Sequence, residues 1–95
     1  MEKDFTKLSI LEQAGIARIL LVLYDENEML TSALQKKVGV SAESYYKARN
    51  YLEEIGLIER YNLNLGKIKP YRLTERGKKI GKYLKKAEEL LMEEI

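Results

Sequence analysis

The stretch SAESYYKARNYLEEIGLIER, residues 41–60, decides the fold of this chain. Ser41 is a typical helix N-cap, and small or apolar residues then recur at the spacing of one helix face. These residues are Tyr45, Ala48, Leu52 and Ile55. Gly56 ends the pattern, and the β-prone pair Leu57-Ile58 follows it directly. The stretch therefore predicts a helix over residues 41–55 that runs straight into a strand.

The other face of this predicted helix is polar. It carries short or flexible hydrogen-bonding side chains, namely Ser44, Tyr46, Lys47 and Asn50. Side chains of this kind can read base edges in a nucleic-acid groove. The pattern therefore makes this face the first candidate for a functional surface.

The residues before Ser41 predict a shorter helix that would pack against the first. Residues 25–28 are a polar turn, and Met29-Leu30 are enough for a brief strand or an extended link. Thr31 can cap a helix over residues 32–38, with Leu34 and Val38 inward and Gly39 as its end. Two short helices joined in this way form a helix-turn-helix, whose second helix enters the DNA major groove.

The N-terminal part predicts one long apolar helix over residues 9–24, which Ser9 and Glu12 would start as a capping box. Its apolar residues cover nearly the whole circumference, and a helix of that kind is buried all round. A domain of 95 residues can hardly cover both sides. A second copy of the chain is the natural cover, which places Ile10 and Leu11 in a predicted dimer interface.

After Gly56 the sequence predicts a β-hairpin, with strands over residues 57–61 and 67–73 and turn residues at 62–66. Pro70 cannot donate to a strand ladder, so the return strand should be an edge strand or bulge there. Thr74 can cap a final helix over residues 75–95.

This final helix has one apolar face and one basic face. The apolar side carries Ile80, Leu84, Ala87, Leu91 and Ile95, with Tyr83 at its margin. Lys78, Lys79, Lys82, Lys85 and Lys86 are expected on the other side, and Gly81 indicates either tolerance or a close neighbour. The apolar spacing is close to a coiled-coil seam, and the acidic C-terminal end opposes the helix dipole. Residues 74–95 therefore predict antiparallel pairing of two copies; a frayed, solvated end is the alternative.

Composition limits the chemistry available. The chain has no cysteine and no histidine, which argues against disulfides, the usual zinc sites and histidine-based catalysis. Neither a phosphate-binding glycine loop nor a paired-carboxylate constellation is present, so we expect no enzyme, cofactor or metal site. The longest apolar run, residues 19–24, is too short for a membrane span and follows no signal peptide. We therefore expect one soluble, cytoplasmic domain without a membrane partner.

Charge is strongly segregated along the chain. Residues 60–86 hold ten Lys or Arg and one Glu, a net charge of +9, so the rest carries −7 of the overall +2. A basic segment of this kind suits a polyanion-binding surface, although a solvated lysine face is equally compatible with it.

Several segments resemble MarR-, ArsR- and PadR-like transcriptional regulators of prokaryotes and archaea. They are TSAL at 31–34, GVS at 39–41, YLEEIGLIER at 51–60 and YRLTERG at 71–77, and the likeness extends over residues 16–79. It implies a winged helix-turn-helix, mainly α with a small β-hairpin and a long C-terminal helix. It also implies a homodimer that binds double-stranded DNA sequence-specifically and regulates transcription.

The resemblance carries roles over to single positions. The helix over 41–55 would lie in the major groove, and the wing over 57–73 would lie against the backbone or minor groove. The DNA-binding residues would be Ser41, Ala42, Ser44, Tyr46, Lys47 and Asn50 on that helix, with phosphate contacts from Lys36, Lys37, Arg60, Lys67 and Lys69. The predicted dimer interface comes instead from the apolar patterns of the first and last helices, and it comprises Ile10, Leu11, Ile80, Tyr83, Leu84, Ala87 and Leu91.

Three residues depart from the family pattern. Gln35 replaces a small residue and Arg49 an apolar one, while Glu43 places a negative charge near the groove-entering end of the helix. The helix over 41–55 has a net charge of −1. This charge favours the alternative function, a winged helix that serves as a protein-interaction or assembly module without specific DNA reading. Seven tyrosines would also suit a small-molecule pocket at the dimer interface, but their spacing does not require one, so an effector stays open.

Overall fold

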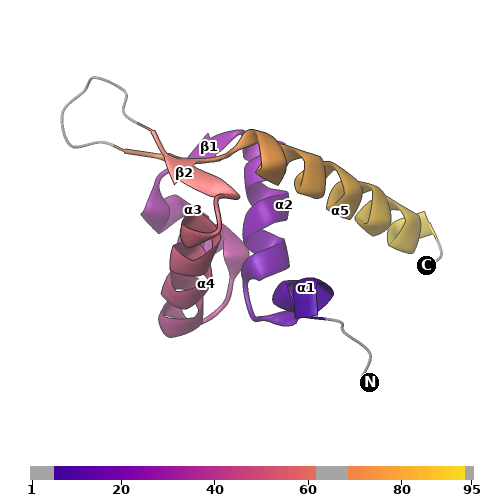
Figure 1. The fold of residues 1–95 in the computed structure, drawn as a ribbon, viewed down its shortest axis with the longest axis horizontal. Helices are drawn as coiled ribbons and strands as arrows, with labels where there is room; N and C mark the ends of the chain where they lie inside the picture. The colour runs from indigo at the N-terminus through magenta and orange to yellow at the C-terminus, as the bar shows by residue number, and fades with distance from the viewer. Residues whose placement is uncertain (1–5, 62–68, 94–95) are drawn as a thin grey trace.

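The computed structural model describes residues 6–61 and 69–93. In chain order the elements are α1 (Thr6–Ser9), the 3₁₀ helix η1 (Ile10–Glu12), α2 (Ile16–Glu26), β1 (Glu28–Met29), α3 (Thr31–Val38), α4 (Ala42–Glu54), β2 (Ile58–Arg60), β3 (Tyr71–Leu73) and α5 (Glu75–Glu93). Helix α2 lies at the centre, with α3 and α4 on one side and α5 on the other (Figure 1). The predicted fold class, mainly α with a small β element and a long last helix, is confirmed.

The core packs side chains of α3, α4 and the sheet around α2. Its buried side chains are Ile16, Ile19, Leu20, Leu23, Leu34, Val38, Tyr45, Ala48, Leu52, Leu57, Ile58, Tyr71 and Leu73, none more than 4% exposed. The inward residues predicted for α3 and α4 are confirmed, except that Ile55 is only half-buried. Burial of each large aliphatic side chain contributes about 1.5–3 kcal/mol, so this cluster fixes the orientation of α4.

The strands form a three-stranded antiparallel sheet with the order β1-β3-β2. Both hairpin strands are shorter than predicted, and the predicted turn at 62–66 lies outside the described residues. The prediction that the return strand is an edge strand or bulges at Pro70 is wrong, because β3 is the central strand and begins only after Pro70. Pro70 lies just before β3, where its carbonyl accepts a hydrogen bond from the Tyr61 N–H at 2.9 Å.

The predicted single helix over residues 9–24 is wrong. The chain breaks at Gly15, whose φ of 91° lies in the left-handed region that favours glycine. A Cβ at Gly15 would also lie 3.4 Å from side-chain atoms of Ala48 and Val40, so the break lets the chain pass close to α4. Ser9 has helical backbone angles (φ −64°, ψ −17°), and its side chain does not cap η1. Helix α2 is not buried all round either, since Leu21 and Val22 are half-buried.

The turn between α3 and α4 follows the sequence closely. Gly39 ends α3 with a φ of 73°, and the Ser41 Oγ accepts a hydrogen bond from the Ser44 N–H at 3.1 Å, as an N-cap should. The prediction that Thr31 caps α3 is wrong, because Leu30 occupies the cap position. Thr31 is the first residue of α3, and its hydroxyl shares a hydrogen bond of 2.7 Å with the Tyr45 hydroxyl.

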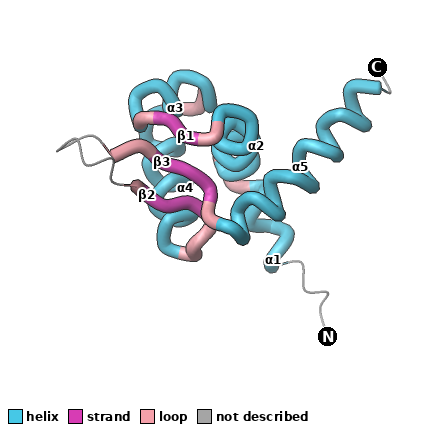
Figure 2. The backbone as a smooth tube through the Cα atoms, turned by 90° about the horizontal axis from the view of Figure 1, so that it is seen from above, coloured by secondary structure: helices cyan, strands magenta, loops and turns pink. Residues whose placement is uncertain are grey.

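Helix α5 is joined to the body by its first half. Thr74 caps it as predicted: its Oγ1 accepts from the Gly77 N–H at 3.1 Å and donates to the Gly56 carbonyl at 2.7 Å. Gly81 allows the close approach of Tyr24, whose atoms would lie 3.1–3.3 Å from an added Cβ. The C-terminal half of α5 projects away from the body (Figure 2). Lys85 does not share the far face predicted for the lysines, because it bonds Asp25 of α2 at 3.2 Å.

Candidate nucleic-acid interface

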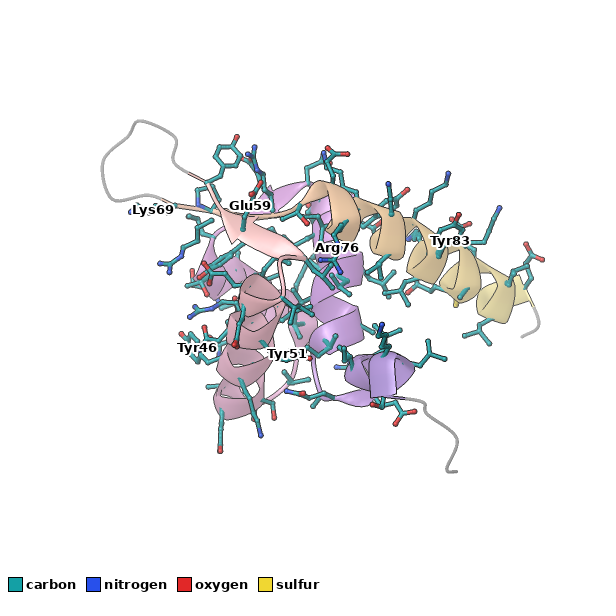
Figure 3. All side chains as sticks on the ribbon, in the orientation of Figure 1. Tyr46, Tyr51, Glu59, Lys69, Arg76 and Tyr83 are labelled. Carbon is teal, nitrogen blue, oxygen red and sulfur yellow. The ribbon has the colours of Figure 1, made fainter. Side chains whose placement is uncertain are left out.

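The outer face of α4 is exposed because the buried stripe on its inner face fixes its rotation. Tyr46 is 40% exposed, and Figure 3 shows it on the outer side of α4. Ser41, Ala42, Lys47 and Asn50 are also exposed, and Ser44 is half-buried. The sequence-predicted α4 residues other than Ser44 are thus exposed, although the Ser41 hydroxyl is already used as the helix cap.

Arg49 links this face to the sheet and to α3, a role that the sequence did not reveal. Its Nη1 lies 3.3 Å from the Thr31 Oγ1, and its Nε and Nη2 lie 3.2 and 2.8 Å from the Asn50 Oδ1. Its Cζ also lies 4.9 Å from the ring centroid of Tyr46 and 5.2 Å from that of Tyr71. Hydrogen bonds and cation–π contacts together explain how a charge occupies a half-buried place.

An open hollow of about 360 Å³ separates the start of α3 from the base of the wing. Its lining residues are Leu30, Thr31, Ser32, Arg49, Arg60, Lys69 and Tyr71. The charged side chains among these described residues are all cationic. The sequence-predicted cations Arg60 and Lys69 therefore meet Arg49 around a space that suits an anion. Lys69 lies at the base of the wing in Figure 3.

Two of the predicted phosphate-binding cations have carboxylate partners. The Lys37 Nζ lies 2.7 Å from the Glu26 Oε2, and the Arg60 Nε lies 3.3 Å from the Glu53 Oε2. The hydrogen bond to Glu26 raises the pKa of Lys37, and the bond to Glu53 raises the pKa of Arg60, so both stay charged at neutral pH. These pairs are exposed and exchange easily for other anions. Lys36 is exposed, while Lys67 lies outside the described residues.

The predicted dimer residues divide into two groups. Ile10, Leu11, Ile80 and Leu84 are partly buried and pack against the core of their own chain. Tyr83, Ala87 and Leu91 are exposed on α5, and Tyr83 projects from that helix in Figure 3. Tyr83 is 72% and Leu91 66% exposed, and the neighbouring Leu90 and Met92 are exposed as well. The projecting half of α5 therefore carries an apolar surface that the described part of the chain leaves uncovered.

Metal-binding clusters and membrane-spanning helices are absent from the described ranges 6–61 and 69–93. Within them no three acidic side chains lie close enough together to hold a metal ion. None of the helices in these ranges combines the length and the apolar character that crossing a membrane requires.

The order of the elements defines the structural class of this protein. A helix-turn-helix followed by a small antiparallel sheet and a long helix is a winged-helix fold, and solved structures of MarR-family transcriptional regulators share it. A proposed MarR-family transcriptional regulator of Porphyromonas gingivalis has a TM-score of 0.78 and 17% sequence identity, over 100% of this chain and 99% of its own. A MarR-family regulator of Silicibacter pomeroyi has a TM-score of 0.73 and 18% identity over 90% of this chain, which spans 62% of that protein.

The crystal structure of F-93 of SSV1 is also similar to this chain, at a higher sequence identity than the two MarR-family structures. It has a TM-score of 0.72 and 29% identity, and the match covers 85% of this chain and 92% of that protein. No protein-family model matches the sequence, and no curated protein matches it. The chain is therefore placed with winged-helix proteins by its fold.

Proposed function

We propose that this chain is a transcriptional regulator that binds double-stranded DNA sequence-specifically. Helix α4 would lie in the major groove, and the wing would lie against the backbone or the minor groove. The observation that carries the proposal is the polar outer face of α4, which lies beside a hollow lined by three cations. Structural likeness to MarR-family regulators supports the same function.

We assign the attraction of DNA phosphates and the recognition of bases to different residues. The helix over 41–55 has a net charge of −1, so it adds little to the attraction of phosphates. We assign that attraction to Lys36, Lys37, Arg60 and Lys69 around α4, and to Lys67 beyond the described residues. Ala42, Ser44, Tyr46, Lys47 and Asn50 are then the candidates for base contacts. Ser41 caps the helix and presents its first turn.

We further propose that the active form is a homodimer paired through α5. The exposed apolar residues of its projecting half are the first support, since large uncovered apolar surfaces mark interaction sites. The second support is the order of charges along α5, where Lys79, Lys82 and Lys86 precede Glu89 and Glu93. Antiparallel pairing of two copies would set the lysines of each against the glutamates of the other, and would offset the acidic C-terminal end.

A salt titration of duplex binding tests the DNA-binding proposal. Fluorescence anisotropy with a labelled random-sequence duplex should give a logarithm of affinity that falls steeply and linearly with the logarithm of salt concentration. Replacing a phosphate-binding cation, as in Lys69→Ala, should reduce that slope by about one. Lys7→Ala is the matched control, because Lys7 is an exposed lysine of α1, and its slope should not change. Absence of binding at low salt would rule out the proposal.

A protein-interaction module is the second candidate function. The negative charge of the α4 segment favours it, as do the carboxylate partners of Lys37 and Arg60. The same titration separates the two functions, because a module that binds only proteins shows no salt-dependent affinity for duplex DNA.

A further inference from the structure

The amide of Asn50 has only one orientation that fits its surroundings. The Nε and Nη2 of Arg49 lie 3.2 and 2.8 Å from the Asn50 Oδ1, and both nitrogens are donors. An amide nitrogen at that place would set donors against donors, so the carbonyl oxygen must face Arg49. Arg49 therefore engages both lone pairs of the oxygen, and the NH₂ group is the part of Asn50 left to face a ligand.

Arg49 is itself held in place, so the contact is more than a mobile surface pair. Its Nη1 donates to the Thr31 Oγ1 at 3.3 Å, and Thr31 in turn bonds the Tyr45 hydroxyl at 2.7 Å. The ring of Tyr46 lies 4.9 Å and that of Tyr71 5.2 Å from its Cζ. Contacts from α3, α4 and β3 thus fix the guanidinium group of Arg49 before any ligand binds. The fixed guanidinium group in turn holds the amide of Asn50 in one orientation.

We propose that Asn50 reads DNA as a hydrogen-bond donor only, and that Arg49 is the residue that positions it. This inference rests on the proposed function and narrows it. The usual contact of asparagine with adenine needs both groups of the amide, because the oxygen accepts from adenine N6 and the nitrogen donates to N7. With its oxygen engaged, Asn50 instead suits acceptors, which guanine presents at N7 and O6 and thymine at O4. Adenine also presents an acceptor at N7, but its N6 donor would then face the amide of Asn50 without an acceptor. Guanine or thymine should therefore be preferred as the base opposite Asn50.

Selection of binding sites from a random duplex pool tests this specificity. Asn50→Ala identifies the base pair that Asn50 contacts, because preference at that pair becomes flat. At this pair the wild-type protein should favour guanine or thymine over adenine by about tenfold, the discrimination of one good side-chain contact. Arg49→Met removes the guanidinium donors and frees the Asn50 oxygen while keeping an unbranched apolar stem, so adenine should gain about tenfold over guanine at the same pair.

The Arg49→Lys variant tests whether the planar guanidinium group of Arg49 or only its positive charge positions Asn50. Lysine keeps the positive charge but lacks the planar fork, so it should shift the preference toward adenine as Arg49→Met does. If Arg49 only held a phosphate, its loss would weaken binding to all sequences equally and leave the preference unchanged. A purely structural role would lower the melting temperature without changing the preference, and circular dichroism melting of each variant measures that effect.

Hydrogen exchange in the free protein gives a second readout that does not depend on DNA. The Nε–H of Arg49 should appear in an NMR spectrum at neutral pH as a slowly exchanging proton, and Asn50→Ala should make its exchange fast. Equal exchange in both proteins would overturn this inference and leave the proposed function intact. A strong wild-type preference for adenine at the identified pair, or no pair that responds to Asn50→Ala, would also overturn it. Failure to bind duplex DNA at low salt would overturn both.

Discussion

Tyr45 joins the core to the candidate interface at the scale of a single residue. Its side chain is fully buried on the inner face of α4, and its hydroxyl bonds Thr31, which also accepts from Arg49. Burial raises the pKa of Tyr45, because the ionised phenol would lose its hydration. The same residue therefore stabilises the fold and supports the Arg49 contact with Asn50.

Tyr45→Phe should lower the free energy of unfolding by about 1 kcal/mol, because it removes one buried hydrogen bond and leaves the ring in place. The raised folded-state pKa predicts that the wild type keeps its stability below about pH 10 and loses it as the pH rises toward that folded-state pKa. The variant should lose less over this window. Urea unfolding at a series of alkaline pH values measures both effects, and equal losses in the two proteins would contradict the assignment.

The difference between Tyr45 and Arg49 shows what a sequence can predict about residues. Tyr45 belongs to a periodic apolar stripe, so its inward direction follows from local spacing alone. Arg49 depends on Thr31 and Tyr71, which come from other elements, and only the tertiary structure brings those contacts together. The polar face of α4 was therefore predictable, whereas the residue that organises it was recognisable only as a departure from the family pattern.

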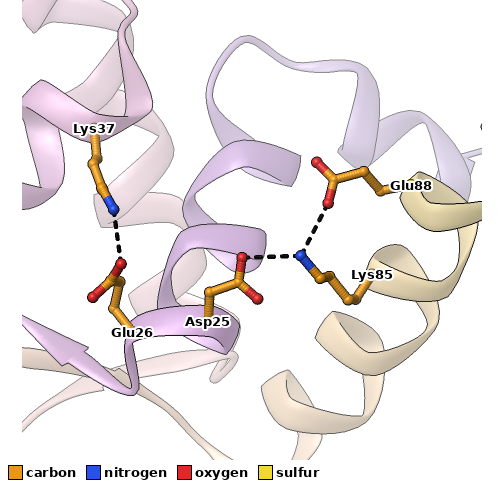
Figure 4. A network of polar contacts seen from close by, with 5 residues as sticks. All are labelled: Asp25, Glu26, Lys37, Lys85 and Glu88. Atoms are coloured by element: carbon orange, nitrogen blue, oxygen red, sulfur yellow. Dashed lines mark hydrogen bonds and ion pairs between the residues drawn. The ribbon is translucent and has the colours of Figure 1, made fainter. Parts of the chain in front are cut away.

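At the scale of elements, two acidic residues at the end of α2 connect three helices. Asp25 and Glu26 lie where the helix dipole is negative, which disfavours acidic side chains. Each has a lysine from a different helix as partner: Lys85 of α5 lies 3.2 Å from Asp25 and also contacts Glu88, while Lys37 of α3 lies 2.7 Å from Glu26 (Figure 4). The cations offset the unfavourable end of α2. In the proposed DNA complex, Glu26 would compete with a phosphate for Lys37.

Glu26→Gln should therefore strengthen duplex binding at low salt, by about two- to fivefold, because Lys37 no longer has to leave a carboxylate. Asp25→Asn is the matched control, since it removes the same charge from a neighbouring carboxylate that pairs with α5. Anisotropy titrations at one fixed salt concentration compare the two variants with the wild type. A gain of the same size in both would indicate a general charge effect and not competition at Lys37.

The element boundaries at Ser41, Gly39 and Thr74 were predictable from their capping residues. The cap signals at Ser9 and Thr31, however, did not correspond to helix caps. Boundaries that depend on tertiary packing could not be predicted from the sequence. Gly15 stands inside an apolar run that continues the helix pattern, and the chain breaks there because α4 passes close by. The sheet gains β1 as a third strand through pairing with β3, a long-range contact that two residues of strand sequence cannot indicate.

At the scale of the whole molecule, α5 projects from a compact winged-helix body and carries uncovered apolar side chains. Three of the seven predicted interface residues are exposed and four pack against their own core. The sequence could predict that α5 is too long for the body to cover. It could not predict how the interface residues divide, because that depends on how α2 and η1 pack in three dimensions.

The paired form should have twice the 11.1 kDa mass of one chain in light scattering, and Tyr83→Asp combined with Leu91→Asp should reduce it to one chain. Both side chains are exposed, so the fold should survive, and circular dichroism checks this. Leu30→Asp is the control, since Leu30 is exposed on the opposite part of the molecule, at the start of α3. A double variant whose mass stays the same as that of the wild type would reject the α5 interface.

Methylation protection of guanine N7 tests most directly whether α4 enters the major groove, because N7 lies on the major-groove edge. A duplex selected by the protein is treated with dimethyl sulfate with and without bound protein. A dimer with α4 in the major groove should give two protected tracts on one face of the duplex, separated by about one helical turn of roughly 10 base pairs. Tyr46→Ala should weaken that protection, while Lys7→Ala should not. Protection confined to adenine N3 in the minor groove, or bound duplex with no N7 protection, would contradict the account.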